Sequence, residues 1–282
     1  MNIRWFTGRR AWRHRDQTAS TATLMPGRHG ARVQEESIIS QPQRLAAHTD
    51  RGLKRSDNQD RALAQELPDG SLMAAVADGV GGVGGGETAS TQAMHTLLAQ
   101  LLDNADGDPG EALERAFVSA NEQVRARAAQ RPELRGMATT LVAALVRGHS
   151  AWLASVGDSR AYLFHQGELT QRTQDHSWVA EQIRAGRLTE EEAEHSEFRN
   201  VITRAVGVAD TVEPDKVGPI SLPAGSLLLL CSDGLHRVVS DDEIAAVLAS
   251  GTPQEMAERL IALANEAGGP DNISVAIVAG AD

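Results

Sequence analysis

Four aspartates lie at the ends of apolar segments that are far apart in the chain. They are Asp78, Asp158, Asp233 and Asp271, in the segments AAVADGVGG, LASVGDSRA, LLLLCSDGL and GGPDNISV. An apolar run bounded by an acid is typical of a buried strand that carries a carboxylate to the edge of a sheet. Carboxylates crowded together repel one another, and their hard oxygen atoms suit Mg²⁺ or Mn²⁺. The pattern therefore predicts a site for divalent cations.

The elements that would position these acids can be read from hydrophobic periodicity and turn residues. We expect strands at 44–49, 62–67, 72–77, 139–146, 151–156, 160–165, 227–231 and 273–278. We expect helices at 87–102, 110–129, 241–249 and 253–267. Because strands follow strands and helices follow helices, the order favours an antiparallel layered α+β fold over repeated βαβ units.

Composition limits the class of protein. The chain has 282 residues, of which 41% are hydrophobic, so it is long enough for one large domain with a full core. Its net charge of -11 argues against a nucleic-acid-binding surface. A single cysteine, Cys231, excludes an intramolecular disulfide and fits a reducing compartment. No apolar stretch reaches the roughly 18 to 20 residues that cross a bilayer, and no secretory signal is recognisable, so we expect a cytoplasmic protein.

The first 40 residues differ from the rest and are expected to form a basic, disordered tail. Arginines dominate this stretch, and Asp16 is the one acid before Glu35. The aromatic residues Trp5, Phe6 and Trp12 lie among the arginines. This mixture leaves open a second interpretation, in which the tail contacts an anionic membrane or a partner protein.

From Thr49 to Val278 the chain resembles the PPM (PP2C-type) metal-dependent Ser/Thr protein phosphatases, in their bacterial form. The resemblance rests on the four acidic segments, on TDRGLKRSDNQD at 49–60 and on MATTLVAAL at 137–145, all in the order that the family has. It implies a two-sheet antiparallel β-sandwich flanked by helix pairs, occupying residues 41–282. It also implies a flap, which controls access of the substrate, at about 175–212.

The resemblance implies roles for the acids. Asp78 matches the carboxylate that bridges two metal ions, and its neighbour Gly79 would contribute a backbone carbonyl to the second ion, since glycine allows a close backbone approach. Asp233 and Asp271 match the carboxylates that complete the shell of the first ion. Asp158 matches the ligand of a third ion that bacterial members bind. Two Mn²⁺ or Mg²⁺ ions, with a third left open, are the cofactors expected.

Three further residues receive roles from the same resemblance. Arg55 is expected to bind the substrate phosphate, since a guanidinium can hold two phosphate oxygens at once. Asp60 is expected to take part in catalysis by orienting water rather than by binding metal directly. Asn272 is expected to support the turn that carries Asp271. In the flap, contact with a phosphopeptide and ordinary surface roles remain equally open for Arg199, Asn200 and Arg204.

The sequence departs from the family pattern at three positions. Gln59 stands where many relatives have Glu, so one carboxylate near the second metal is lost. Val80 stands where animal relatives have a histidine proposed as general acid, which leaves protonation of the leaving oxygen unassigned. Ala138 replaces a common glycine in the MGTT-like motif.

The expected activity is hydrolysis of phosphoserine and phosphothreonine in proteins. A pair of divalent cations would lower the pKa of a water molecule between them and promote in-line attack on phosphorus. The expected partners are a bacterial Ser/Thr kinase or the substrates of that kinase, with no nucleic acid involved, and the protein is expected to be a monomer.

Other interpretations remain open at this stage. Cys231 and Arg237 have the C-x5-R spacing of Cys-dependent phosphatases, although the carboxylate of Asp233 beside the thiol would oppose its ionisation. A PP2C fold without catalytic activity could instead serve as a binding module. Residues 79–84 satisfy G-x-G-x-x-G, but no second strand follows the next helix, so a dinucleotide-binding βαβ unit is not favoured.

Overall fold

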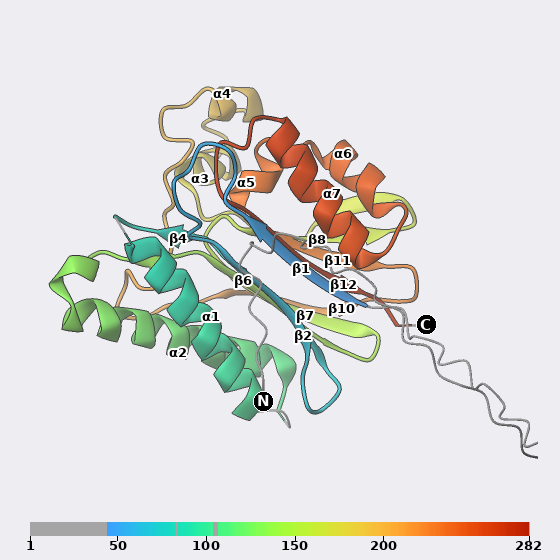
Figure 1. Cartoon of the computed structure of the whole chain (residues 1–282), viewed down its shortest axis with the longest axis horizontal. Coiled ribbons are helices and arrows are strands. Elements are labelled where there is room, and N and C mark those ends of the chain that lie inside the picture. The colour runs from blue at the N-terminus through green and yellow to red at the C-terminus, as the bar shows by residue number, and fades with distance from the viewer. Residues whose placement is uncertain (1–43, 83, 104–106, 282) are drawn as a thin grey trace, which may run out of the picture.

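The computed structural model describes residues 44–281, except 83 and 104–106. The basic tail predicted at 1–40 lies outside these residues. Within them, the chain forms two five-stranded sheets and one short two-stranded sheet, and all strand pairs are antiparallel. Two large sheets in face-to-face contact form the sandwich that the sequence predicts (Figure 1).

The strands come from widely separated parts of the chain. The first sheet contains, in spatial order, β1 (Leu45–Asp50), β12 (Ile273–Ala279), β11 (Leu227–Cys231), β8 (Arg160–His165) and β9 (Glu168–Gln171). The second contains β10 (Asp215–Ser221), β7 (Ser150–Val156), β6 (Leu141–Arg147), β3 (Leu72–Ala77) and β2 (Arg61–Glu66). The short sheet pairs β4 (Gly79–Val80) with β5 (Ala138–Thr139).

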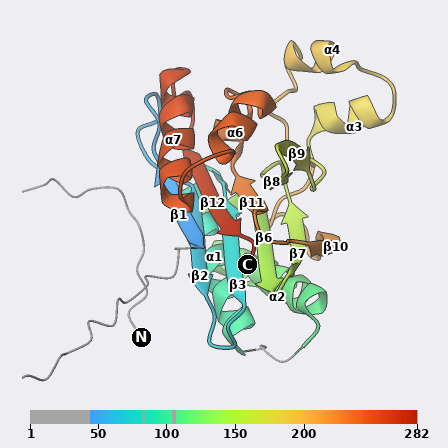
Figure 2. The same cartoon turned by 90° about the vertical axis from the view of Figure 1, so that its right-hand side faces the viewer.

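A pair of helices covers the outer face of each large sheet (Figures 1 and 2). The pair α1 (Gly85–Asp103) and α2 (Pro109–Gln130) packs on the second sheet, and α6 (Asp241–Leu248) and α7 (Pro253–Glu266) pack on the first. Shorter elements are η1 (Pro132–Leu134), α3 (Trp178–Arg184), α4 (Glu190–Glu194) and α5 (Asp233–His236). The four layers match the sandwich flanked by helix pairs that the resemblance implies, and the antiparallel pairing matches the α+β fold expected from the order of the elements.

Local sequence explains where these helices begin. The side chain of Asp108 accepts a hydrogen bond from the backbone of Glu111, and Pro109 occupies the first turn of α2. Both α6 and α7 start with a capping box, Ser240 with Glu243 and Thr252 with Glu255. The buried positions of α7 lie on one face at helical spacing: Met256, Ala257, Leu260, Ile261 and Ala264.

The central strands are buried on both faces because helices cover one side and the opposing sheet covers the other. In β3, Met73, Ala75 and Ala77 pack toward the α1–α2 pair, whereas Ala74 and Val76 pack between the two sheets. This explains why β3 reads as a continuous apolar run instead of alternating. The strand ends remain free to carry polar groups, and the predicted acids lie there.

All strands and long helices expected from the sequence are present within a few residues of their expected limits. The sequence reading missed β9, β10 and the short helices α3, α4 and α5, because these elements are brief or only partly apolar. Gly79 of the G-x-G-x-x-G stretch belongs to β4, and the helix that follows leads to α2 rather than to a parallel strand, which excludes a βαβ unit. In the described residues, every helix is too short or too polar to traverse a bilayer.

Candidate metal centre

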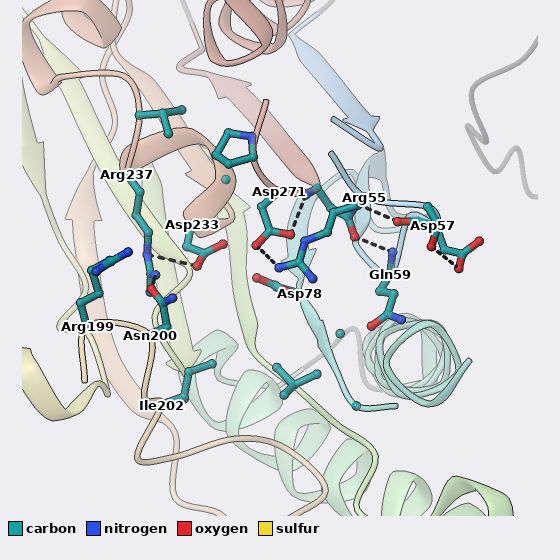
Figure 3. Close-up of a pocket in the computed structure, with 18 residues that line it drawn as sticks. Arg55, Asp57, Gln59, Asp78, Arg199, Asn200, Ile202, Asp233, Arg237 and Asp271 are labelled. Carbon is teal, nitrogen blue, oxygen red and sulfur yellow. Dashed lines mark hydrogen bonds and ion pairs between the residues drawn. The ribbon is translucent and has the colours of Figure 1, made fainter. Parts of the chain in front are cut away.

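One end of the sandwich opens into a cavity of about 780 Å³ that most of the predicted site residues line, with the exception of Asp60 and Asp158. Figure 3 shows the side chains of Asp78, Asp233 and Asp271 directed toward the same space, with Arg55 on one side and Arg237 on the other. The backbone of Gly79 and residues Arg199, Asn200 and Ile202 also line this cavity. Segments more than 200 residues apart in sequence, such as those of Arg55 and Asp271, therefore contribute to one site.

The topology accounts for this convergence. Asp78 follows β3 in the middle of one sheet, while Asp233 begins α5 just after β11 and Asp271 comes just before β12 in the other. Because β11 and β12 are antiparallel neighbours, the end of β11 and the start of β12 lie at the same edge. Asp158 occupies the turn between β7 and β8, and its side chain lies close enough to that of Asp233 to interact electrostatically.

The backbone of Asp78 is fixed by the two threonines of the MATT motif. The Asp78 amide donates a hydrogen bond to Thr140 Oγ1 at 3.0 Å, and the Asp78 carbonyl accepts from Thr139 Oγ1 and from the Thr140 amide, both at 2.8 Å. The departure at Ala138 is accommodated in β5, where this buried residue pairs with Val80. These bonds orient Asp78 and explain the role of a motif that the sequence alone left without a mechanism.

Gly79 is required by its surroundings. A Cβ atom at this position would lie 2.2 Å from the carbonyl oxygen of Gly86 and 2.6 Å from that of Gln59. Only glycine allows this approach of three backbone segments. The amide side chain of Gln59 lies against Gly86 in turn, so the departure from Glu places a neutral group beside the start of α1.

Asp60 lies deeper than the cavity and is fully buried. Neither of its carboxylate oxygens has a hydrogen-bond partner, although the hydroxyls of Ser232 and Ser274 are close. Burial raises the pKa of Asp60 to about 7, the two hydroxyls oppose this shift, and the charge of Asp233 adds to it. A buried carboxylate of this kind is stabilised in its charged form by a further hydrogen-bond donor, such as water, or by a cation.

Burial and neighbouring charges also raise the pKa of two acids that line the cavity. Burial raises the pKa of Asp78 well above its ordinary value, and the charges of Asp60 and Asp233 raise it further. Burial also raises the pKa of Asp233 despite the opposing charge of Arg237. Crowded acids of this kind are stabilised in their charged form by added positive charge.

Two arginines partly supply that charge. Arg55 donates a hydrogen bond to Asp271 Oδ2 at 2.6 Å, and its side chain is 56% exposed, so it can turn toward a ligand in the cavity. Arg237 forms ion pairs with Asp158 and Asp233. The sequence alone left a pairing of Arg237 with Cys231 open as an alternative.

The alternative Cys-dependent site is not supported. Cys231 is a fully buried residue of β11 whose pKa is raised by burial to about 12, and Arg237 points to the carboxylates instead of wrapping around the thiol. A nucleophilic cysteine needs the opposite environment, with an accessible thiol of lowered pKa. The C-x5-R spacing is therefore a coincidence of sequence.

Asn272 ties together the two segments that carry Arg55 and Asp271. Its side-chain amide donates to the carbonyls of Arg51 at 2.9 Å and Asp57 at 2.8 Å, and its Oδ1 accepts from the amide of Gln59 at 2.8 Å. The backbone amide of Asn272 donates to Asp271 Oδ1 at 2.8 Å. The expected supporting role thus has a concrete form, because one side chain fixes the whole 51–59 loop.

The donor set fits divalent cations. Asp60 Oδ1 and Oδ2, Asp158 Oδ1 and Asp233 Oδ1 are buried oxygens with no hydrogen-bond partner, and carboxylate and carbonyl oxygens are what Mg²⁺ and Mn²⁺ prefer. Among the described residues, no three His, Cys, Asp or Glu side chains already surround a single point at ligand distance. Asp271 is turned toward Arg55, so ion binding at Asp271 requires this pairing to loosen, whereas Asp158 and Asp233 each direct one oxygen toward Arg237.

The segment expected to form the flap lies beside the cavity. It contains α3 and α4, and a bridge between Ser177 and Ile202 joins its two sides. The rings of Trp178 and Phe198 pack at a centroid distance of 4.8 Å. Of the three flap residues singled out, Arg199 and Asn200 line the cavity, whereas Arg204 pairs with Asp215 at 2.7 Å and lies elsewhere.

Comparison with known proteins agrees with this arrangement. Residues 46–265 match the family model described as Protein phosphatase 2C. The chain is 41% identical over 234 residues to the serine/threonine protein phosphatase PstP of Mycobacterium tuberculosis, which covers 83% of this chain and 44% of PstP. It is 38% identical over 233 residues to the protein phosphatase PhpP of Streptococcus pneumoniae, which covers 82% of this chain and 94% of PhpP.

The likeness extends to three dimensions. The solved catalytic domain of PstP in complex with two manganese ions superposes with a TM-score of 0.76 at 40% identity, covering 85% of this chain and 98% of that domain. This chain spans less than half the length of full-length PstP but nearly all of the solved catalytic domain and of PhpP. The chain belongs to the protein phosphatase 2C family.

Proposed function

We propose that this chain hydrolyses phosphoserine and phosphothreonine in proteins and depends on Mn²⁺ or Mg²⁺. The observation that carries the proposal is the convergence of Asp78, Asp233 and Asp271 on one cavity, with partnerless buried oxygens behind it and the exposed guanidinium of Arg55 at its rim. The manganese ions of the related PstP domain support the choice of cofactor.

Asp78, the Gly79 carbonyl, Asp233 and Asp271 would hold two divalent cations. When bound, such ions lower the pKa of water and stabilise charge on the phosphoryl oxygens during in-line displacement. The chain provides the remaining functions. Thr139 and Thr140 hold Asp78 in place, and Asn272 fixes the loop that carries Arg55.

Arg55 would bind the phosphoryl group of the substrate. Its pairing with Asp271 holds the guanidinium at the mouth of the cavity, and exchange of that carboxylate for a phosphate preserves the charge-assisted geometry. Asp60, with two free acceptor oxygens behind the cavity, would accept hydrogen bonds from water and orient it toward phosphorus. The flap residues Arg199 and Asn200 would contact the peptide around the phosphorylated residue.

The cellular setting of the proposal follows the family pairing. The partner would be a Ser/Thr kinase or the substrates of that kinase, met in the cytoplasm by a monomeric enzyme. The basic residues 1–40 would remain outside the phosphatase domain, which we place at 41–282 with its flap at about 175–212.

The test is turnover of a phosphothreonine peptide with Mn²⁺ by the wild type, Asp233→Asn and Cys231→Ser, each repeated with EDTA. We expect EDTA and Asp233→Asn each to reduce turnover by at least about 100-fold, since both remove the stabilisation that the ions provide. Cys231→Ser should remain active. Turnover that persists in EDTA but disappears in Cys231→Ser would overturn the proposal, and a wild type that binds Mn²⁺ without turnover would identify a binding module.

A further inference from the structure

Arg237 occupies the space between two acids of the site, Asp158 and Asp233. Its Nη2 atom donates to Asp158 Oδ2 at 2.8 Å, and its Nε atom lies 3.1 Å from Asp233 Oδ2. Figure 3 shows the guanidinium beside Asp233, next to Asn200 of the flap segment. The family resemblance had assigned a third metal ion to Asp158, so this arginine stands where a cation would be needed.

The position of Arg237 is built into the local fold. It follows the short helix α5, its backbone amide donates to the Asp233 carbonyl at 3.1 Å, and its Nη1 atom donates to Asn200 Oδ1. The preceding residue, His236, is half-buried and contacts the Asp158 carbonyl through Nε2 at 3.1 Å. Two adjacent side chains thus hold both the backbone and the carboxylate of Asp158.

The charges of the group are complementary. The side chain of Asp158 is only 2% exposed and that of Asp233 is 13% exposed, so these neighbouring carboxylates would repel each other without a cation between them. Burial disfavours the charged form of Arg237, but the carboxylates of Asp233 and Asp158 raise its pKa above the ordinary value. The arginine therefore carries the positive charge that this pair of acids needs.

We propose that the guanidinium of Arg237 is a built-in cation that replaces a third metal ion at Asp158. It occupies one oxygen of each acid and leaves Asp233 Oδ1 available to the ions shared with Asp78. A divalent cation and the guanidinium would repel each other in this space, so only one of them can neutralise Asp158. This inference rests on the proposed function, which places two ions at Asp78, Asp233 and Asp271. It adds that Asp158 is neutralised by Arg237 instead of by a third ion.

The experiment counts Mn²⁺ ions bound to the whole chain at millimolar Mn²⁺, using the electron paramagnetic resonance signal of free Mn²⁺ after equilibrium dialysis. Arg237→Gln removes the charge and frees two carboxylate oxygens, so it should bind one more equivalent than the wild type. Arg237→Lys keeps the charge and should bind the wild-type number. Arg199→Gln is the matched control, since Arg199 lines the same cavity and has no ion pair with an acid among the described residues, and it should also leave the number unchanged.

Two further variants identify the site of the extra ion. In the Arg237→Gln background, Asp158→Asn should remove the additional equivalent, whereas Asp158→Asn alone should leave the wild-type number. A lower number of bound ions in Asp158→Asn alone would refute the proposal that Arg237 replaces the third ion. The same holds if Arg237→Gln binds no more Mn²⁺ than the wild type while its thermal unfolding remains cooperative. Neither result would contradict the proposed phosphatase function. A wild type that binds no Mn²⁺ would refute the proposed function itself.

Discussion

Substitution of Asp60 by asparagine should flatten the pH dependence of the stability of the metal-free protein. Asp60 is fully buried, and neither carboxylate oxygen has a hydrogen-bond partner. Burial raises its pKa from 3.8 to about 7. Below about pH 4 the carboxyl is protonated in the folded and unfolded states alike. Between about pH 4 and pH 7, Asp60 loses its proton in the unfolded chain but keeps it in the folded protein.

The sign and the size of the effect follow from this difference. Because the pKa of Asp60 is raised in the folded state, its contribution is most favourable below about pH 4 and is lost as the pH rises through about 7. A difference of about three pH units corresponds to about 4 kcal/mol in all, at about 1.4 kcal/mol per unit. About 3 kcal/mol of this falls between pH 5 and pH 8.

The measurement is urea unfolding in EDTA from pH 5 to pH 8, followed by tryptophan fluorescence. The free energy of unfolding of the wild type should fall with pH, and the fall should be about 3 kcal/mol smaller in Asp60→Asn. The control is Asp242→Asn, which removes an exposed carboxylate of α6 and should leave the pH dependence of the wild type. If Asp60→Asn shows the same fall as the wild type, Asp60 is not the buried acid that the structure describes.

Three other perturbations test the site. The thiol of Cys231 should resist iodoacetamide at pH 8 in the native protein and react fully in urea, since burial raises its pKa to about 12; rapid native labelling would contradict its place in the core. Gly79→Ala should destabilise the protein by about 3 kcal/mol in thermal or urea unfolding, because its Cβ would meet the Gly86 carbonyl at 2.2 Å. Gly82→Ala, where the space is open, should cost nothing measurable, and equal losses for the two would refute the packing argument. Arg55→Lys should lower kcat/KM for a phosphothreonine peptide by about tenfold or more, because lysine cannot hold two phosphate oxygens; unchanged kinetics would exclude the clamp.

The local chemistry of the chain could be predicted from its sequence. Apolar runs defined β3, β6, β11 and β12, since central strands of a covered sandwich carry short continuous runs of hydrophobic residues, and the turn residues at their ends favour strands over helices. Acids at the ends of those runs predicted where carboxylates would gather. Asp78, Asp233 and Asp271 do meet in one cavity, because β11 and β12 are antiparallel neighbours that bring Asp233 and Asp271 to one edge, and β3 of the facing sheet carries Asp78 to the same end of the sandwich.

Weakly patterned elements could not be predicted in the same way. Strand β10 is mostly exposed and contains Pro219, and its place in the sheet is fixed by pairing with β7, more than 60 residues earlier. The short helices α3 and α4 begin at caps formed by Ser177 and Thr189, and the bridge between Ser177 and Ile202 fixes the start of α3; neither helix has a long apolar face. Their existence depends on contacts that lie outside the local sequence.

Pairings between distant side chains were decided by the tertiary structure alone. The spacing of Cys231 and Arg237 left a thiol site open as an alternative, yet the end of β11 buries the thiol while the turn after α5 directs the arginine to Asp158 and Asp233. Hydrophobic periodicity records which residues are buried, and so the sequence determined the strands and helices, while the order of its acidic motifs carried the resemblance to the family. Which buried charges face one another depends on strand register and loop geometry, and only the folded chain brings Asp158 and Arg237, 79 residues apart, to within 2.8 Å.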